Sequence, residues 1–241
     1  MKTLISGQGN RMLATLLSGL LMGMSIMFST SALAQTTTIV GSAHDFSALG
    51  WSQLNGEICV VCHTPHNAVS PTAGPLWNRT LTAVTNYTMY SPNTIPGSDI
   101  QGIFGGQPTG VSKLCLSCHD GTIAIDSFGR NTDGTPFTSG TVFVGALNAN
   151  ANIGEGELTG FTGDLSNDHP VAFTFPTAGA DNEIVQPIGG VIAAVLPLFG
   201  TSNDQMECAT CHDVHATGTF AKLLRVDNSA ASALCLTCHL K

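Results

Sequence analysis

The stretch Glu57–Asn67, with the sequence EICVVCHTPHN, places Cys59, Cys62 and His63 in the order C-x-x-C-H. This order is the attachment signature of a c-type haem. A second histidine, His66, follows three residues after the first. The signature gives His63 a role but gives His66 none, so the role of the second histidine has to be argued from the rest of the chain.

The same signature occurs four times and accounts for all eight cysteines of the chain. In a c-type site the two thiols bond to the vinyl groups of one haem, and the adjacent histidine binds the iron from the proximal side. Disulfides and zinc ribbons also use paired cysteines, but neither requires a histidine after every pair. We therefore predict four haem c groups as cofactors. The predicted attachment cysteines are Cys59, Cys62, Cys115, Cys118, Cys208, Cys211, Cys235 and Cys238, and the predicted proximal iron ligands are His63, His119, His212 and His239.

The N-terminus has the pattern of a secretory signal peptide. Lys2 and Arg11 precede an apolar run from Met12 to Phe28, and the small residues Ala32 and Ala34 follow it. This pattern predicts a signal peptide over residues 1–34 and a secreted protein. A membrane anchor is the alternative, but the run is at the short end for a spanning helix. We expect residues 35–241 to form a single tetrahaem cytochrome c domain with no membrane span.

The charge balance excludes one class of partner. Without residues 1–34, the chain keeps 6 of its 8 basic side chains and all 16 acidic ones, for a net charge of −10. Nucleic acids and anionic membrane surfaces are bound by basic surfaces. We therefore expect no nucleic-acid partner.

The number of histidines matches the number of iron positions. Four haems have eight axial positions, and the chain has eight histidines. Four of them lie outside the signatures and are enough to give every iron two histidine ligands. Methionine is the competing sixth ligand, and Met89 and Met206 are the two methionines beyond the signal peptide. The predicted distal iron ligands are His44, His66, His169 and His215.

Ligation by two histidines has a functional consequence. An iron with six protein and porphyrin ligands has no open position for a substrate, and two imidazoles favour a lower potential than histidine with methionine. The pattern therefore predicts an electron carrier and not an enzyme.

The spacing of His63 and His66 limits what His66 can bind. Three residues of extended chain span at most about 10 Å, which is too short for the chain to pass round the porphyrin edge while His63 stays bound. His66 therefore serves a different haem or none, and the same holds for His215 after His212. Chain spacing favours His44 for the first haem, His169 for the second and His215 for the fourth. It leaves His66 without a clear partner inside the chain.

The segments between the signatures are rich in glycine, proline, serine and asparagine, which indicates turns and loops. Residues 171–175 (VAFTF) favour a short strand. Residues 189–200 favour a strand or an apolar surface that packs on haem, and a short helix is plausible at each signature. The expected fold is mostly irregular coil, with short α-helices and a few short β-strands, wrapped around four covalently bound haems.

The sequence resembles the extracellular tetrahaem cytochromes of metal-reducing bacteria, of the type called outer-membrane cytochrome E. The segments SAHDFS (42–47), GEICVVCHTPHN (56–67) and LSNDHPVAFTF (165–175) carry the resemblance. It implies a mostly coil protein whose subunits join head to tail into a filament, or nanowire, in which one haem takes a histidine from the neighbouring subunit. The residue that matches this donated ligand is His66.

The resemblance also implies an extracellular or outer-surface location. Copies of the chain, other electron-transfer cytochromes, and extracellular metal oxides or electrodes are then the expected partners. Two alternatives remain open at this point. One is a soluble monomeric electron shuttle of the periplasm, and the less favoured one is a multihaem reductase.

Overall fold

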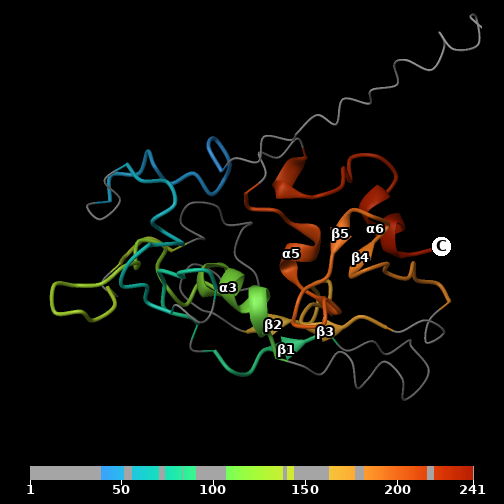
Figure 1. Cartoon of the computed structure of the whole chain (residues 1–241), viewed down its shortest axis with the longest axis horizontal. Coiled ribbons are helices and arrows are strands. Elements are labelled where there is room, and N and C mark those ends of the chain that lie inside the picture. Colours follow the sequence, from blue (N-terminus) through green and yellow to red (C-terminus); the bar gives the residue numbers. More distant parts are fainter. Residues whose placement is uncertain are drawn as a thin grey trace, which may run out of the picture. The chain divides into compact units, whose positions relative to one another are not determined.

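The structure is a computed structural model of the whole chain (Figure 1), and the residues described belong to one compact unit, Thr36–Lys241. The predicted signal peptide, residues 1–34, lies outside the described residues. None of the helices in the described part is long and apolar enough to cross a membrane. The described residues are 39–51, 56–70, 74–82, 84–90, 107–137, 140–143, 163–176, 182–215 and 220–240.

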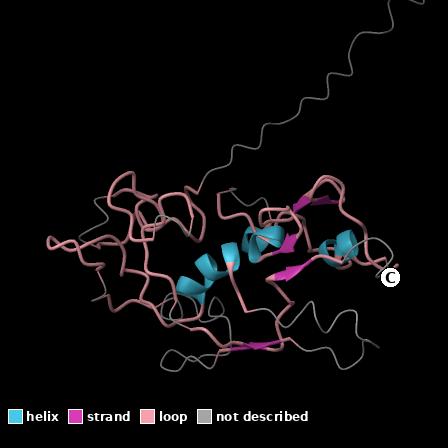
Figure 2. Cartoon of the chain, turned by 60° about the horizontal axis from the view of Figure 1, so that its bottom comes forward, coloured by secondary structure: helices cyan, strands magenta, loops and turns pink. Residues whose placement is uncertain are grey.

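Short helices carry three of the four signatures, and loops connect most of the remaining elements (Figure 2). The longest is α3, which contains the whole second signature. The third and fourth signatures begin in helices and end with their histidines at the C-caps. The helices are α3 (Gly110–His119), α5 (Cys208–Cys211), the 3-10 helix η2 (Ala221–Leu223) and α6 (Ala233–Cys238).

The first signature forms a turn, so the expectation of a helix at every signature was wrong there. The His63 amide donates to the Cys59 carbonyl at 2.8 Å, which is one helical hydrogen bond. Pro65 disfavours a helical conformation at Thr64 and has no amide hydrogen to donate. The chain instead leaves as an extended segment, and His63 forms an isolated bridge with Trp77.

The same bond recurs at the third and fourth signatures. His212 donates to the Cys208 carbonyl at 3.1 Å, and His239 donates to the Cys235 carbonyl at 2.8 Å. Each signature thus winds through one helical turn, which carries its first cysteine and its histidine.

Three pairs of two-residue strands complete the regular structure of the described residues. One pair is parallel and two are antiparallel. β3 lies inside the predicted strand 171–175, and the apolar run 189–200 folds into the β4–β5 hairpin. The parallel pair is β1 (Thr88–Met89) with β2 (Asp164–Leu165). The antiparallel pairs are β3 (Phe173–Thr174) with β6 (Gln205–Met206), and β4 (Val191–Ile192) with β5 (Leu196–Pro197).

Small apolar clusters lie next to the signatures. Val61, inside the first signature, packs with Ile125 and Phe128. Leu116, inside the second, packs with Tyr87 and Leu165. The largest cluster, against which Cys238 of the fourth signature packs, contains Phe173, Phe175, Ile192, Leu196, Leu198 and Met206. In the first two signatures, a variable position is therefore an anchor that holds the cysteines and histidine in place.

Candidate functional site

The four signatures lie near one another in chain order. Cys62 of the first lies near Cys118 of the second, and the Cys115 thiol shares a hydrogen bond with that of Cys208 in the third. Cys211 in turn lies close to Cys235 of the fourth. All eight cysteines are free thiols. The attachment positions thus form a continuous series, which a relay of redox groups requires.

Burial keeps most of these thiols protonated. It raises the pKa of Cys62 to about 12 and that of Cys238 to about 11. The hydrogen bond with Cys208, followed by burial, raises the pKa of Cys115 well above its ordinary value. A neutral thiol is a weak nucleophile and a poor metal ligand. Among the described residues, no group of three or more histidine, cysteine or acidic side chains is arranged to hold a metal ion.

A buried carboxylate joins the second and third signatures. Glu207, the N-cap of α5, accepts a hydrogen bond from the Ser112 amide at 3.0 Å and another from the Ser112 hydroxyl. The same hydroxyl oxygen accepts from the Cys208 amide at 3.1 Å. The starts of α3 and α5, which lie side by side in Figure 1, are tied together by these bonds. Burial raises the pKa of Glu207, and the bonds from Ser112 oppose that change.

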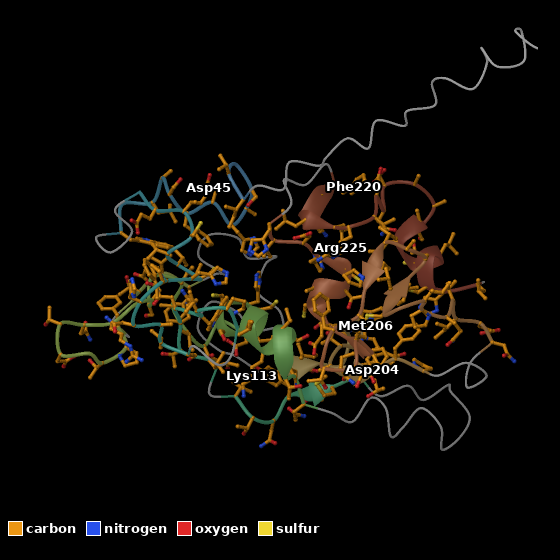
Figure 3. The ribbon with its side chains drawn as sticks, in the orientation of Figure 1. Asp45, Lys113, Asp204, Met206, Phe220 and Arg225 are labelled. Carbon is orange, nitrogen blue, oxygen red and sulfur yellow. The ribbon has the colours of Figure 1, made fainter. Side chains whose placement is uncertain are left out.

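An ion pair holds the loop that follows the third signature. Arg225 pairs with Asp213 at 2.9 Å and donates from Nε to the Ala209 carbonyl of α5 at 2.9 Å. Figure 3 shows Arg225 beside this helix. The loop carries Lys222, whose carbonyl oxygen lies 2.9 Å from Nδ1 of His212. The ion pair therefore supports the residue that orients a predicted proximal ligand.

Two predicted distal histidines lie opposite predicted proximal ones. The ring centroids of His44 and His119 are 6.0 Å apart, and those of His63 and His215 are 6.2 Å apart. A metal–imidazole bond is about 2.0 Å long, so two imidazoles on opposite sides of one iron, each centroid roughly 1.1 Å behind its nitrogen, stand about 6 Å apart. The two observed spacings fit an iron between the rings.

A third pair is formed by His169 and His239. Burial lowers the pKa of His169, the bond to Pro170 raises it, and the nearby charge of His239 lowers it. The last effect places the two rings in the same neighbourhood, as the charge of His212 does for His44. His169 is thus a neighbour of the fourth signature.

Several of the histidines are held in the orientation of metal ligands. Nδ1 of His63 lies 2.6 Å from the carbonyl oxygen of Pro75, and Nδ1 of His169 lies 2.9 Å from the carbonyl oxygen of Pro170. A carbonyl oxygen only accepts, so Nδ1 carries the proton and Nε2 keeps its lone pair. Metal-binding histidines are commonly fixed in this way. His212 has the same arrangement with Lys222.

The ring of His44 is kept neutral by its surroundings and not by a hydrogen bond to a carbonyl oxygen. Burial, followed by the charges of His119, His212 and His215, lowers its pKa to about 4, so the ring is neutral near pH 7. Its Nδ1 is buried and has no hydrogen-bond partner among the described residues. A neutral imidazole is the form that binds iron. The free thiols, the paired rings and the oriented nitrogens together fit covalently bound haem.

These neighbours differ from those that chain spacing favoured. His44 lies at the second signature and not the first, His169 at the fourth and not the second, and His215 at the first and not the fourth. Chain spacing limits how far a segment can reach but does not determine which signature it meets. Both methionines that competed as ligands pack in apolar clusters, Met89 against Leu165 and Met206 in the largest cluster.

Among the described residues, two predicted ligands have no ring facing their own, although the charge of one of them, His212, acts on His44. His66 is exposed, and the structure gives its ring no partner among the described residues. His212 is also exposed, and within the described ranges no aromatic ring stacks on the His212 imidazole. His212 is a predicted proximal ligand and His66 a predicted distal one.

Sequence reasoning missed the buried charged residues around the signatures. Arg79 and Asp120 are both fully buried, and Glu207 is nearly so. No spacing or periodicity in the sequence singles them out.

Residues 202–241 match the model of a family described as a doubled CXXCH motif. This segment contains the third and fourth signatures. The match indicates covalently bound haem c and supports a multihaem c-type cytochrome that acts in electron transport. A search of the curated proteins found no match to the chain. Bound haem supplies an iron that gains and loses one electron.

Proposed function

We propose that the chain carries electrons through four c-type haems, each with two histidine ligands, as the subunit of an extracellular filament of the outer-membrane cytochrome E type. The nearness of the four signatures in chain order supports an uninterrupted path. The histidine pairs, and the Nδ1 bonds that leave Nε2 available, support ligation by two imidazoles.

The observation that carries the filament proposal concerns the two histidines left over. Three distal histidines each face or lie near a proximal histidine of the first, second or fourth signature. The histidine that lies near the third signature, His44, already faces His119, and His66 has no such site among the described residues. Both rings are exposed. We therefore assign His66 to the iron of the third signature in the neighbouring subunit.

The proposal implies no catalytic site, because every iron has two protein ligands once subunits join. Residues 1–34 serve as the export signal, and electrons pass to external acceptors such as metal oxides, electrodes or partner cytochromes. The alternative, a monomeric shuttle of the periplasm, requires His66 to reach an iron of its own chain.

Electron microscopy of the purified haem-loaded protein tests the proposal. Filaments that repeat every four haems are expected. A haem assay and low-spin spectra on the same sample establish four haems with two strong ligands each. Monodisperse monomers with four low-spin haems would support the shuttle instead, and a high-spin haem inside intact filaments would revive the reductase.

A further inference from the structure

A buried arginine lies near the first two signatures. The side chain of Arg79 is fully buried. Its guanidinium donates to the carbonyl oxygens of Ile125 at 2.6 Å and Ala124 at 2.8 Å. Its Nε is buried and has no hydrogen-bond partner in the described part of the chain. Five N–H donors belong to a guanidinium, so several of them remain for another acceptor.

The segment that carries Arg79 joins the two signatures. The Asn78 amide donates to the carbonyl of Cys62 at 2.8 Å. The Thr82 amide donates to the hydroxyl of Ser117, inside the second signature, at 3.3 Å. Arg79 lies between these two attachments, and its charge lowers the pKa of both Cys62 and Cys118, against the larger effect of burial.

No carboxylate of the described residues forms an ion pair with this charge. Among the described residues, the ion pair joins Arg225 and Asp213, and Arg79 takes no part in it. Asp120 lies near Cys118, but its oxygens accept hydrogen bonds from Thr82, Tyr87 and Thr122. A buried cation without a counter-ion is strongly destabilising. The site therefore calls for an anion.

We propose that Arg79 binds a propionate carboxylate of one of the two haems attached at residues 59–63 and 115–119. This inference rests on the proposed function, because the propionates arrive with the haems. Arginine presents a planar fork of donors that matches a carboxylate. The two backbone carbonyls fix the guanidinium from one side and leave its remaining donors for that anion.

The proposal has an electrochemical consequence. A buried positive charge favours the ferrous iron, which carries one positive charge less than the ferric iron. At a separation of about 10 Å the effect on a neighbouring haem is roughly tenfold in the ferric-to-ferrous ratio. A tenfold ratio corresponds to about 59 mV for a one-electron couple. Removal of the charge is expected to lower the potentials of two haems out of four.

The test uses three variants of the haem-loaded full chain. Arg79→Met removes both the charge and the fork, whereas Arg79→Lys keeps the charge and loses the fork. Arg130→Met is the matched control, because Arg130 also donates to backbone carbonyls, those of Asn67 and Gly134, but is exposed. The measurements are haem content, redox titration followed by optical and EPR spectra, and the resonance Raman bending mode of the propionates, which responds to hydrogen bonding.

We expect all three variants to bind four haems. Arg79→Met should lower two potentials by about 59 mV, Arg79→Lys should lower them much less, and Arg130→Met should leave all four unchanged. The propionate mode should shift in both Arg79 variants. Unchanged potentials in Arg79→Met, or a propionate mode that stays fixed, would overturn the inference while four bound haems keep the proposed function intact. A wild-type chain without covalent haem would overturn the proposed function itself.

Discussion

The imidazole rings of His63 and His215 lie nearly parallel, with their planes 24° apart and their centroids separated by 6.2 Å. His63 belongs to the first signature and His215 follows the third, so the pair joins distant parts of the chain. Trp77 packs against His63 in a T-shaped arrangement, at a centroid distance of 5.8 Å. This packing and the bond from Nδ1 to Pro75 hold the His63 ring while the other face of the site receives His215.

His215→Ala is expected to remove the distal ligand of the first haem. The cysteines and the proximal histidine remain, so four haems should still attach, but one of them should change from low-spin to high-spin. Optical and EPR spectra of the purified variant measure this fraction. Four low-spin haems in His215→Ala would show that another ligand serves His63.

His66→Ala is expected to leave the haem content at four and to abolish filaments. The exposed ring of His66 has no partner in the described part of its own chain. Its loss should therefore weaken the junction between subunits. Size-exclusion chromatography and electron microscopy measure the assembly.

The control for this prediction is Asn67→Gly, next to His66 on the same exposed segment, because glycine accepts the left-handed φ of 56° found there. It should assemble like the wild type. If His66→Ala forms normal filaments, the assignment of His66 to a neighbouring subunit is wrong.

The sequence identified the predicted ligands but not their spatial neighbours. The C-x-x-C-H order sets the local geometry at each signature, and the strand predicted at 171–175 contains β3. The neighbours of His44 and His215 depend on loop paths, which leave no periodic signal. The turn at the first signature also follows from Pro65, whose effect was readable beforehand.

Buried charges could not have been predicted for a related reason. A charged residue in a sequence is expected at the surface, and its burial depends on partners from distant segments. Arg79 bonds to carbonyls that lie some 45 residues further along the chain. Its role therefore became visible only in the structure.

Glu207→Gln is expected to change how stability depends on pH. Burial raises the pKa of Glu207 above its ordinary value of 4.5, so the folded state holds this proton more tightly than the unfolded state does. The stabilisation from this proton is complete below 4.5 and is lost as the pH rises through the higher folded value. Glutamine cannot ionise, so the wild type should lose stability relative to Glu207→Gln over this range. Thermal unfolding at a series of pH values measures the difference.

Ser112→Ala should widen the pH range over which the wild-type carboxyl of Glu207 loses its stabilising proton. The Ser112 hydroxyl donates to the carboxylate and lowers the pKa of Glu207, so its removal should raise this pKa further. Parallel pH profiles for the wild type and Glu207→Gln would contradict the prediction.

Asp120→Asn is expected to destabilise the fold by about 2–4 kcal/mol, because hydrogen bonds to a buried charged acceptor contribute more than neutral ones. One oxygen of Asp120 accepts from the Tyr87 and Thr82 hydroxyls, and the other accepts from the Thr122 amide and hydroxyl. An asparagine amide group replaces one acceptor with a donor, which then faces hydroxyl groups or an amide. Chemical denaturation of the haem-loaded protein, followed by circular dichroism, measures the loss.

The matched control is Asp133→Asn. Asp133 accepts from the amide and hydroxyl of Thr135, two residues further on, in the same local pattern that joins Asp120 to Thr122. It is exposed and accepts no bond from a distant segment among the described residues, so this variant should unfold like the wild type. Equal losses in the two variants would place the effect in the local turn. A loss confined to Asp120→Asn would place it in the bonds from Tyr87 and Thr82, which hold the segment after Arg79 against the end of α3.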